Sequence, residues 1–209
     1  MIHLPTRADR RALDAIARRA DKGIPDAVRY MLALEELDVE DTWDRIAESG
    51  HPVAAKCGYS STTGAAVALS AATAKSVLGH RANAAFGLEW VKGGVYFDGV
   101  TASAVPVLVE FCLATFATNA PGTASTSVTP VQTYGRAITH GQTAARNWTT
   151  EPTVLSVSQE RLITPNGGVW EWEYFEKSRP DCDVSNGFVI RCTAPAAVNA
   201  RAGIDVERI

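Results

Sequence analysis

Residues 198–207 read VNARAGIDVE, in which apolar and polar side chains alternate along the whole stretch. A period of two is typical of a β-strand with one face in a hydrophobic core and the other in water. The stretch VPVLVEFCL at 105–113 repeats the alternation with bulkier side chains, and its Pro106 fits near a strand start or at a sheet edge. The faces expected to point inward are Val198, Ala200, Ala202, Ile204 and Val206 in the first stretch and Val105, Val107, Val109, Phe111 and Leu113 in the second.

Further strands are expected on both sides of these two stretches. Short runs suited to strands are separated by turn signals, with no helical crossover between them. The runs are 65–71, 75–80, 86–91, 94–98, 131–139, 153–160, 168–175 and 187–193, and the turn signals are Gly93-Gly94, Asp98-Gly99, Asn166-Gly167-Gly168 and Asn186-Gly187. About ten short strands at this spacing predict a mainly β fold, an antiparallel β-sandwich or jelly roll over residues 51–209.

Residues 1–50 differ from the rest of the chain in being dense in Arg, Asp and Glu. Thr6 as a helix cap and Pro25 in the first turn of a second helix predict a short N-terminal helical segment. Its apolar stripes either pack on each other or on the β domain, or dock on a partner subunit. Because carboxylates outnumber the arginines of this segment, no nucleic-acid partner is expected.

The stretch TFATNAPGTASTSVTPVQT, residues 115–133, fits no strand and has too little bulk to form a core. We expect it to be an extended arm or loop that lies across a neighbouring subunit, or else a mobile loop. If it is such an arm, deletion of residues 115–133 leaves a folded monomer that no longer assembles.

Nothing in the sequence carries the signature of a catalytic or metal site. The four histidines are isolated, the four cysteines show no metal-ligand spacing, and no nucleotide-binding or hydrolase motif is present; GYSSTTG at 58–64 lacks the lysine of a phosphate loop. The formal charge of −3 gives no global attraction to an anionic membrane. The charged start MIHLPTRADRR and the absence of a long apolar run indicate synthesis in a cytoplasm and no membrane partner. We therefore expect no enzyme, no cofactor and reduced, core-forming thiols at Cys112 and Cys192.

The most conspicuous local pattern is WEWEYF at 170–175, which places Trp170, Trp172 and Tyr174 on one face of a strand and two glutamates on the other. The aromatic face either packs into the sandwich or a subunit interface, or stacks on a sugar. Glu171 and Glu173 do not predict a glycosidase, because nothing supplies the apolar setting that a general acid needs.

Four stretches resemble a group of uncharacterised virion structural proteins of tailed phages, especially those of actinobacteria. They are VYFDGVTASAVPVLVEF (95–111), FATNAPGTASTSVTPVQTYGRA (116–137), EPTVLSVSQERLITPNGG (151–168) and GFVIRCTAPAAVNARAGIDVER (187–208), and the resemblance spans roughly residues 90–208. It implies a capsid-associated protein, located in the virion and assembled in the host cytoplasm.

The sequence thus favours a capsid decoration or minor capsid protein that stabilises the shell through subunit contacts. Its expected partners are the major capsid protein and copies of itself, in a homo-oligomer or bound to the lattice. The expected interface residues are Phe116, Pro121, Val128, Pro130, Trp148, Trp170 and Trp172. The alternatives are a tail or spike component that binds host glycans through an aromatic platform around Trp172 and, with least support, a hydrolase whose site converges from distant residues.

Overall fold

The computed structural model describes residues 57–97, 105–135 and 140–209. The predicted helical segment 1–50, the turn signal Asp98-Gly99 and the end of the predicted strand 131–139 lie outside these ranges, so they stay predictions. No helix in the described ranges is long and apolar enough to span a bilayer.

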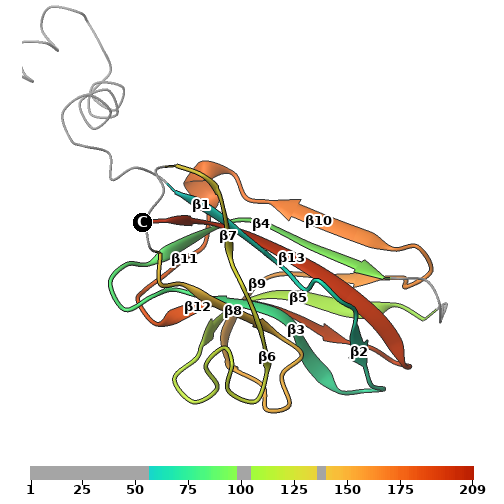
Figure 1. The fold of residues 1–209 in the computed structure, drawn as a ribbon. Helices are drawn as coiled ribbons and strands as arrows, with labels where there is room; N and C mark the ends of the chain where they lie inside the picture. The colour runs from blue at the N-terminus through green and yellow to red at the C-terminus, as the bar shows by residue number, and fades with distance from the viewer. Residues whose placement is uncertain (1–56, 98–104, 136–139) are drawn as a thin grey trace, which may run out of the picture. The chain divides into compact units, whose positions relative to one another are not determined.

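Thirteen strands in the described ranges form two antiparallel sheets, drawn as two layers in Figure 1. The seven-stranded sheet runs β10-β4-β13-β1-β7, with β11 beside β4 and β2 beside β13; the six-stranded sheet runs β6-β8-β3-β12-β5-β9. The elements are β1 (Gly58–Thr62), β2 (Val67–Leu69), β3 (Ala74–Arg81), β4 (Leu88–Phe97), β5 (Val107–Thr115), β6 (Thr126–Val128), β7 (Val131–Tyr134), β8 (Thr143–Arg146), β9 (Thr153–Ile163), β10 (Val169–Glu173), a 3-10 turn (Glu176–Ser178), β11 (Asp181–Cys182), β12 (Asn186–Thr193) and β13 (Val198–Arg208).

Aromatic side chains from both sheets meet in the main core. Trp90 of β4 lies 5.1 Å from Phe111 of β5 and 5.0 Å from Phe188 of β12, measured between ring centroids. Phe111 also stacks on Trp170 of β10 at 4.4 Å. Burial of these large rings between the layers supplies the main free energy of the fold. The predicted mainly β, antiparallel sandwich is confirmed.

The alternation in residues 198–207 is confirmed in β13. All five apolar side chains are buried in the main core, while Arg201 is exposed and Asp205 is half-buried on the other face. β13 pairs with β1 on one side and with β4 on the other, so it lies in the middle of the seven-stranded sheet. Glu207 departs from the pattern, because it is buried although it belongs to the polar set.

The prediction of a turn at Gly93-Gly94 is wrong, because β4 runs unbroken through both residues. The predicted strands 86–91 and 94–98 are therefore parts of one strand. The reason is packing. A Cβ on Gly93 would lie 2.7 Å from the Phe111 ring, so only glycine lets the core aromatics come this close to the strand.

The expectation that residues 115–133 fit no strand is wrong for β6, whereas β7 matches the start of the predicted run 131–139. β6 pairs with β8 in one sheet and β7 pairs with β1 in the other, so this stretch crosses between the layers. Phe116 at its start is fully buried. Deletion of residues 115–133 should therefore disrupt the fold instead of leaving a folded monomer.

A second, small hydrophobic cluster covers the face of the six-stranded sheet that points away from the main core. It contains Ala114, Phe116, Ala145, Trp148 and Val189. Val189 stands between the inward-facing Phe188 and Ile190 of β12, so it points to the opposite face. Gly79 of β3 leaves the room that the Trp148 ring occupies, because a Cβ there would lie 2.7 Å from the ring.

Candidate functional site

The structure places most of the predicted interface residues inside the chain's own fold. Trp170 belongs to the main core, Phe116 and Trp148 to the small cluster, and Pro130 is buried as well. Pro121, Val128 and Trp172 are half-buried and keep part of their surface accessible. Subunit contacts at these seven positions stay a prediction, and only the last three offer side-chain surface to a partner.

The aromatic ladder of β10 faces inward. Trp170 and Tyr174 are buried in the main core and Trp172 packs against it, while Glu171 and Glu173 are exposed on the other face. This matches the expectation that the ladder packs into the sandwich with its glutamates in water. Glycan binding through Trp172 stays a prediction. The rings of Trp170 and Tyr174 could not take part in it, because both are buried.

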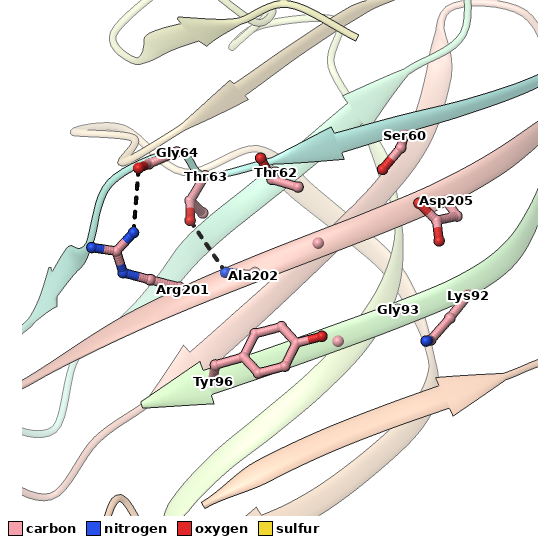
Figure 2. A pocket seen from close by; sticks show the side chains of 12 residues that line it. Ser60, Thr62, Thr63, Gly64, Lys92, Gly93, Tyr96, Arg201, Ala202 and Asp205 are labelled. Carbon is pink, nitrogen blue, oxygen red and sulfur yellow. Dashed lines mark hydrogen bonds between the residues drawn. The ribbon is translucent and has the colours of Figure 1, made fainter. Parts of the chain in front are cut away.

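A shallow groove of about 450 Å³ crosses the outer face of the seven-stranded sheet over β1, β13 and β4 (Figure 2). Gly94 and Gly203 lie opposite each other in register and form its floor. Arg201 stands at one end, where one of its N–H groups donates to the carbonyl of Gly64 over 3.3 Å, and Lys92, Asp205 and Ser60 stand at the other end. We call this surface the glycine groove.

Tyr96 of β4 forms one wall of the glycine groove. Its hydroxyl donates to Glu171, and Lys92 forms an ion pair with the same carboxylate at 3.0 Å. The hydrogen bond to Glu171, together with burial, raises the pKa of Tyr96 to about 12, so the phenol stays protonated at neutral pH. No sequence motif marks this site, because its lining residues come from three separate stretches of the chain.

The end strands of the two sheets, β9 and β10, lie on the same side of the sandwich, which we call the β9/β10 side. Arg161 of β9 lies over the Trp170 ring, and the Ser158 and Tyr174 hydroxyls are 2.6 Å apart. In the described part of the chain, β9 pairs only with β5 and β10 only with β4. Exposed apolar side chains occur on both strands and on the loop after β10, namely Leu155, Val157, Leu162, Val169 and Phe175.

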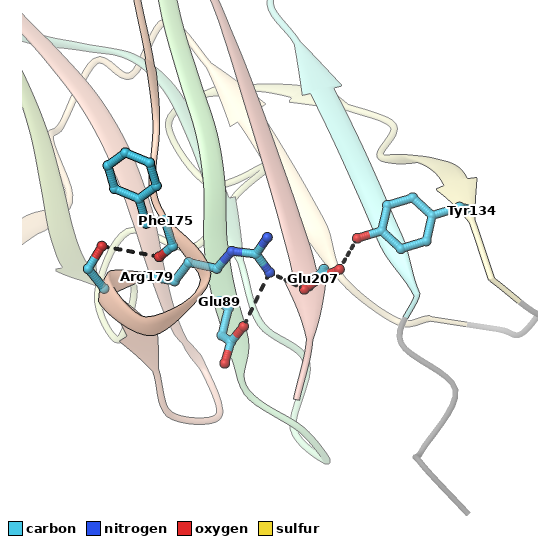
Figure 3. A network of polar contacts seen from close by, with 6 residues as sticks. Glu89, Tyr134, Phe175, Arg179 and Glu207 are labelled. Carbon is cyan, nitrogen blue, oxygen red and sulfur yellow. Dashed lines mark hydrogen bonds and ion pairs between the residues drawn. The ribbon is translucent and has the colours of Figure 1, made fainter. Parts of the chain in front are cut away.

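A polar network ties the edge strand β7 to the loop after β10 (Figure 3). Tyr134 of β7 donates to Glu207, and Arg179 bridges Glu207 and Glu89, with the latter carboxylate 3.7 Å away. Burial, followed by the hydrogen bond to Glu207, raises the pKa of Tyr134. Both carboxylates share one guanidinium, so this network is suited to holding strands together.

His80 lies fully buried between the sheets. Its Nδ1 is 3.1 Å from the Ser61 hydroxyl of β1, and its Nε2 is 2.7 Å from the Gln142 amide oxygen. Burial lowers the pKa of His80 from 6.5 to about 4, so the ring is neutral at pH 7. A serine beside a histidine is also found in hydrolases, but Ser61 is only 1% exposed and a substrate cannot reach it.

The thiols behave as core residues. All four cysteines lie in the described ranges, where they are buried and form no disulfide, as expected for Cys112 and Cys192. Burial raises the pKa of Cys112 to about 12, and the pKa of Cys192 is raised for the same reason. In the described ranges, no three His, Cys, Asp or Glu side chains are grouped closely enough to hold a metal ion.

Comparisons with protein-family models, with curated proteins and with solved structures found no match to this chain. The geometry of the described surfaces therefore carries the functional argument.

Proposed function

We propose that this chain is a virion structural protein, a capsid decoration or minor capsid protein that stabilises the shell through subunit contacts. Two observations support it: the resemblance that the sequence of residues 90–208 bears to phage virion proteins, and the exposed apolar side chains of β9, β10 and the loop after β10. The second observation carries the proposal, because it gives a physical means of association.

β9 is an eleven-residue edge strand, and an edge strand presents a row of backbone N–H and C=O groups to any chain that can pair with it. Proteins that must stay monomeric commonly place charges, prolines or short strands at such edges. β9 carries the exposed charges Glu160 and Arg161, but it also exposes Leu155, Val157 and Leu162, the last with 65% of its surface accessible. The edge is therefore suited to contact with another subunit.

The loop after β10 adds a second anchor to the same side. Phe175 is 85% exposed, which is unusual for a phenylalanine in a folded domain. Beside it lies a hollow of about 170 Å³ whose lining includes Trp172, Tyr174 and Ser158. Exposed aromatic residues next to a hollow are typical of the centre of a protein interface, since they bury large area at little entropic cost.

Shell stabilisation needs no chemical reaction, because it depends only on the surface area buried between subunits. Each copy on the major capsid lattice would bury an interface of standard size, roughly 1,200 to 2,000 Å² in total, and so bridge capsomers. The proposed partners are the major capsid protein and further copies of this chain, and the proposed location is the virion.

The test uses intact particles of the phage that encodes the chain. Quantitative mass spectrometry with electron microscopy should find this protein in many copies on the shell. A handful of copies at one vertex would move the proposal to the tail, and absence from the particle would overturn it.

A paired substitution tests the surface itself. Leu162→Lys places a charge near the C-terminal end of β9, and we expect the variant to fold normally but to be lost from particles. The control is Val131→Lys, which changes a side chain of similar exposure, 62%, at the opposite edge of the seven-stranded sheet. Equal incorporation of both variants would remove the β9/β10 side from the mechanism.

A further inference from the structure

The glycine groove has the shape of a small-molecule site. Gly94 and Gly203 lie opposite each other in β4 and β13, and a Cβ on Gly203 would meet nothing closer than 3.9 Å, so the sheet surface is open beside the Tyr96 ring. Its volume of about 450 Å³ lies within the range of known ligand sites, roughly 300 to 1,000 Å³. The floor is paired backbone in the middle of a sheet, so the groove exists before any ligand arrives.

Tyr96 offers a fixed aromatic surface at this groove. Its ring lies over Gly94, where a Cβ would be 3.4 Å from two ring carbons, and its hydroxyl is held by Glu171. The ring therefore has little freedom to lose on binding, while 36% of the residue's surface stays accessible. A rigid ring of this kind binds flat apolar surfaces well.

The polar groups around the ring have hydrogen-bonding capacity left. In the described part of the chain, the side chains of Ser60, Thr62 and Asp205 make no hydrogen bond, and Arg201 uses one donor on the Gly64 carbonyl. A carboxylate accepts, a guanidinium donates through five N–H groups, and a hydroxyl does both. The groove thus presents donors and acceptors around an apolar platform.

The charges of the groove balance. Lys92 and Arg201 are positive, whereas Asp205 in the groove and Glu171 behind Lys92 are negative. A phosphate or sulfate ligand would meet carboxylates, and a cation would meet the two basic groups. A ligand without net charge fits best, and among such ligands a sugar combines an apolar ring face with hydroxyls that donate and accept.

We propose that the glycine groove is a binding site for neutral oligosaccharides, with Tyr96 as the stacking platform and Asp205 and Arg201 as hydrogen-bonding partners of the sugar hydroxyls. This site lies on a different surface from the inward-facing ladder of β10, and it goes beyond the proposed shell function. A surface-bound virion protein with such a site would hold the particle near glycans.

The test is a titration of the full chain, followed by backbone amide chemical shifts. The probes are neutral trisaccharides of glucose, galactose and N-acetylglucosamine, with a sulfated disaccharide for comparison. We expect at least one neutral trisaccharide to bind with a Kd of about 1 mM or tighter, and to shift the amides of Gly94, Tyr96 and Gly203.

Four variants test whether the sugar binds at the glycine groove. Tyr96→Ala removes the platform and should weaken binding at least about tenfold, whereas Tyr96→Phe keeps the ring but loses the bond to Glu171, so it should weaken binding less than Tyr96→Ala does. Gly203→Val fills the groove where a Cβ meets nothing closer than 3.9 Å, so it should abolish binding without unfolding the protein. Phe175→Ala, which removes an exposed ring elsewhere, should bind as the parent does.

Three results would overturn the proposal. They are no shift with any neutral trisaccharide at about 10 mM, binding of the sulfated probe alone, and binding that survives in a folded Gly203→Val variant. A thermal melt of each variant establishes that it is folded.

Discussion

Gly93 and Gly203 lie in neighbouring strands of the seven-stranded sheet, yet a methyl group at each would meet different surroundings. On Gly93 it points into the main core, 2.7 Å from the Phe111 ring and 3.1 Å from Trp90. Phe111 stacks between Trp90 and Trp170, so it has no free direction in which to move. On Gly203 the methyl group points into the glycine groove and meets its nearest neighbour at 3.9 Å.

The first prediction compares these two glycines. Gly93→Ala should destabilise the domain by about 1–3 kcal/mol, because the core must shift to admit the methyl group. Gly203→Ala should leave the stability unchanged or slightly raised, because alanine loses less backbone entropy on folding. Urea unfolding followed by tryptophan fluorescence measures both; equal losses would contradict the packing that we assign to Gly93.

Individual residues show which burial patterns the sequence predicts and which it does not. The inward set of β13 follows from alternation alone, because the pleat puts every second side chain on the same face. Glu207 belongs to the polar set of the same strand but is buried by Tyr134 and Arg179. Both partners lie far away in the sequence, so no local pattern could identify them.

At the scale of elements, long apolar strands were predicted and short polar ones were missed. β3, β9, β12 and β13 correspond to predicted runs, whereas β1 and β8 were not expected. β1 reads GYSST and owes its strand conformation to pairing with β13 and β7 on its two sides. Tertiary pairing of this kind overrides weak local propensity. β6, inside the interval 115–133, was missed for the same reason.

The second prediction concerns the small cluster on the outer face of the six-stranded sheet. Trp148→Ala should cost about 3–5 kcal/mol, because it empties the space that Gly79 and Phe116 leave for the indole. Phe175→Ala is the control: the ring is 85% exposed, so its loss should change the stability by no more than about 0.5 kcal/mol. Chemical denaturation measures both, and a Trp148→Ala variant as stable as the control would show that the cluster contributes little.

For the whole molecule, the sequence predicted two layers but not the order of their strands. Strand order follows from contacts between residues far apart in the chain, and the hydrophobic alternation says only which face is buried. The glycine groove depends on that order, since β1, β13 and β4 must be neighbours for Ser60, Asp205 and Lys92 to meet. The sequence therefore could not predict the candidate site, even where it predicted the strands that carry the site's residues.

The third prediction follows from His80, which connects the two sheets through Ser61. In the unfolded chain the ring takes up a proton near its usual pKa of 6.5, whereas in the fold it does so only near 4. The stability that depends on neutral His80 is fully present above pH 6.5 and is lost as the pH falls toward 4, by roughly 3 kcal/mol in total.

Urea unfolding at pH 7 and pH 4.5 measures this loss. His80→Gln lacks the ionisable group, so its stability should fall less on acidification than that of the parent, whatever its stability at pH 7. An identical pH dependence in both proteins would show that His80 does not carry the effect.

The position of β13 has a consequence for biosynthesis. It is the last strand of the domain in chain order, yet it lies between β1 and β4 and also pairs with β2. A nascent chain on the ribosome cannot complete the larger layer until residues 198–208 have left the exit tunnel. Until then β1 and β4 lack their shared neighbour and present unsatisfied edges to other nascent chains. Chaperone capture during translation would cover these edges and so protect the yield of native protein.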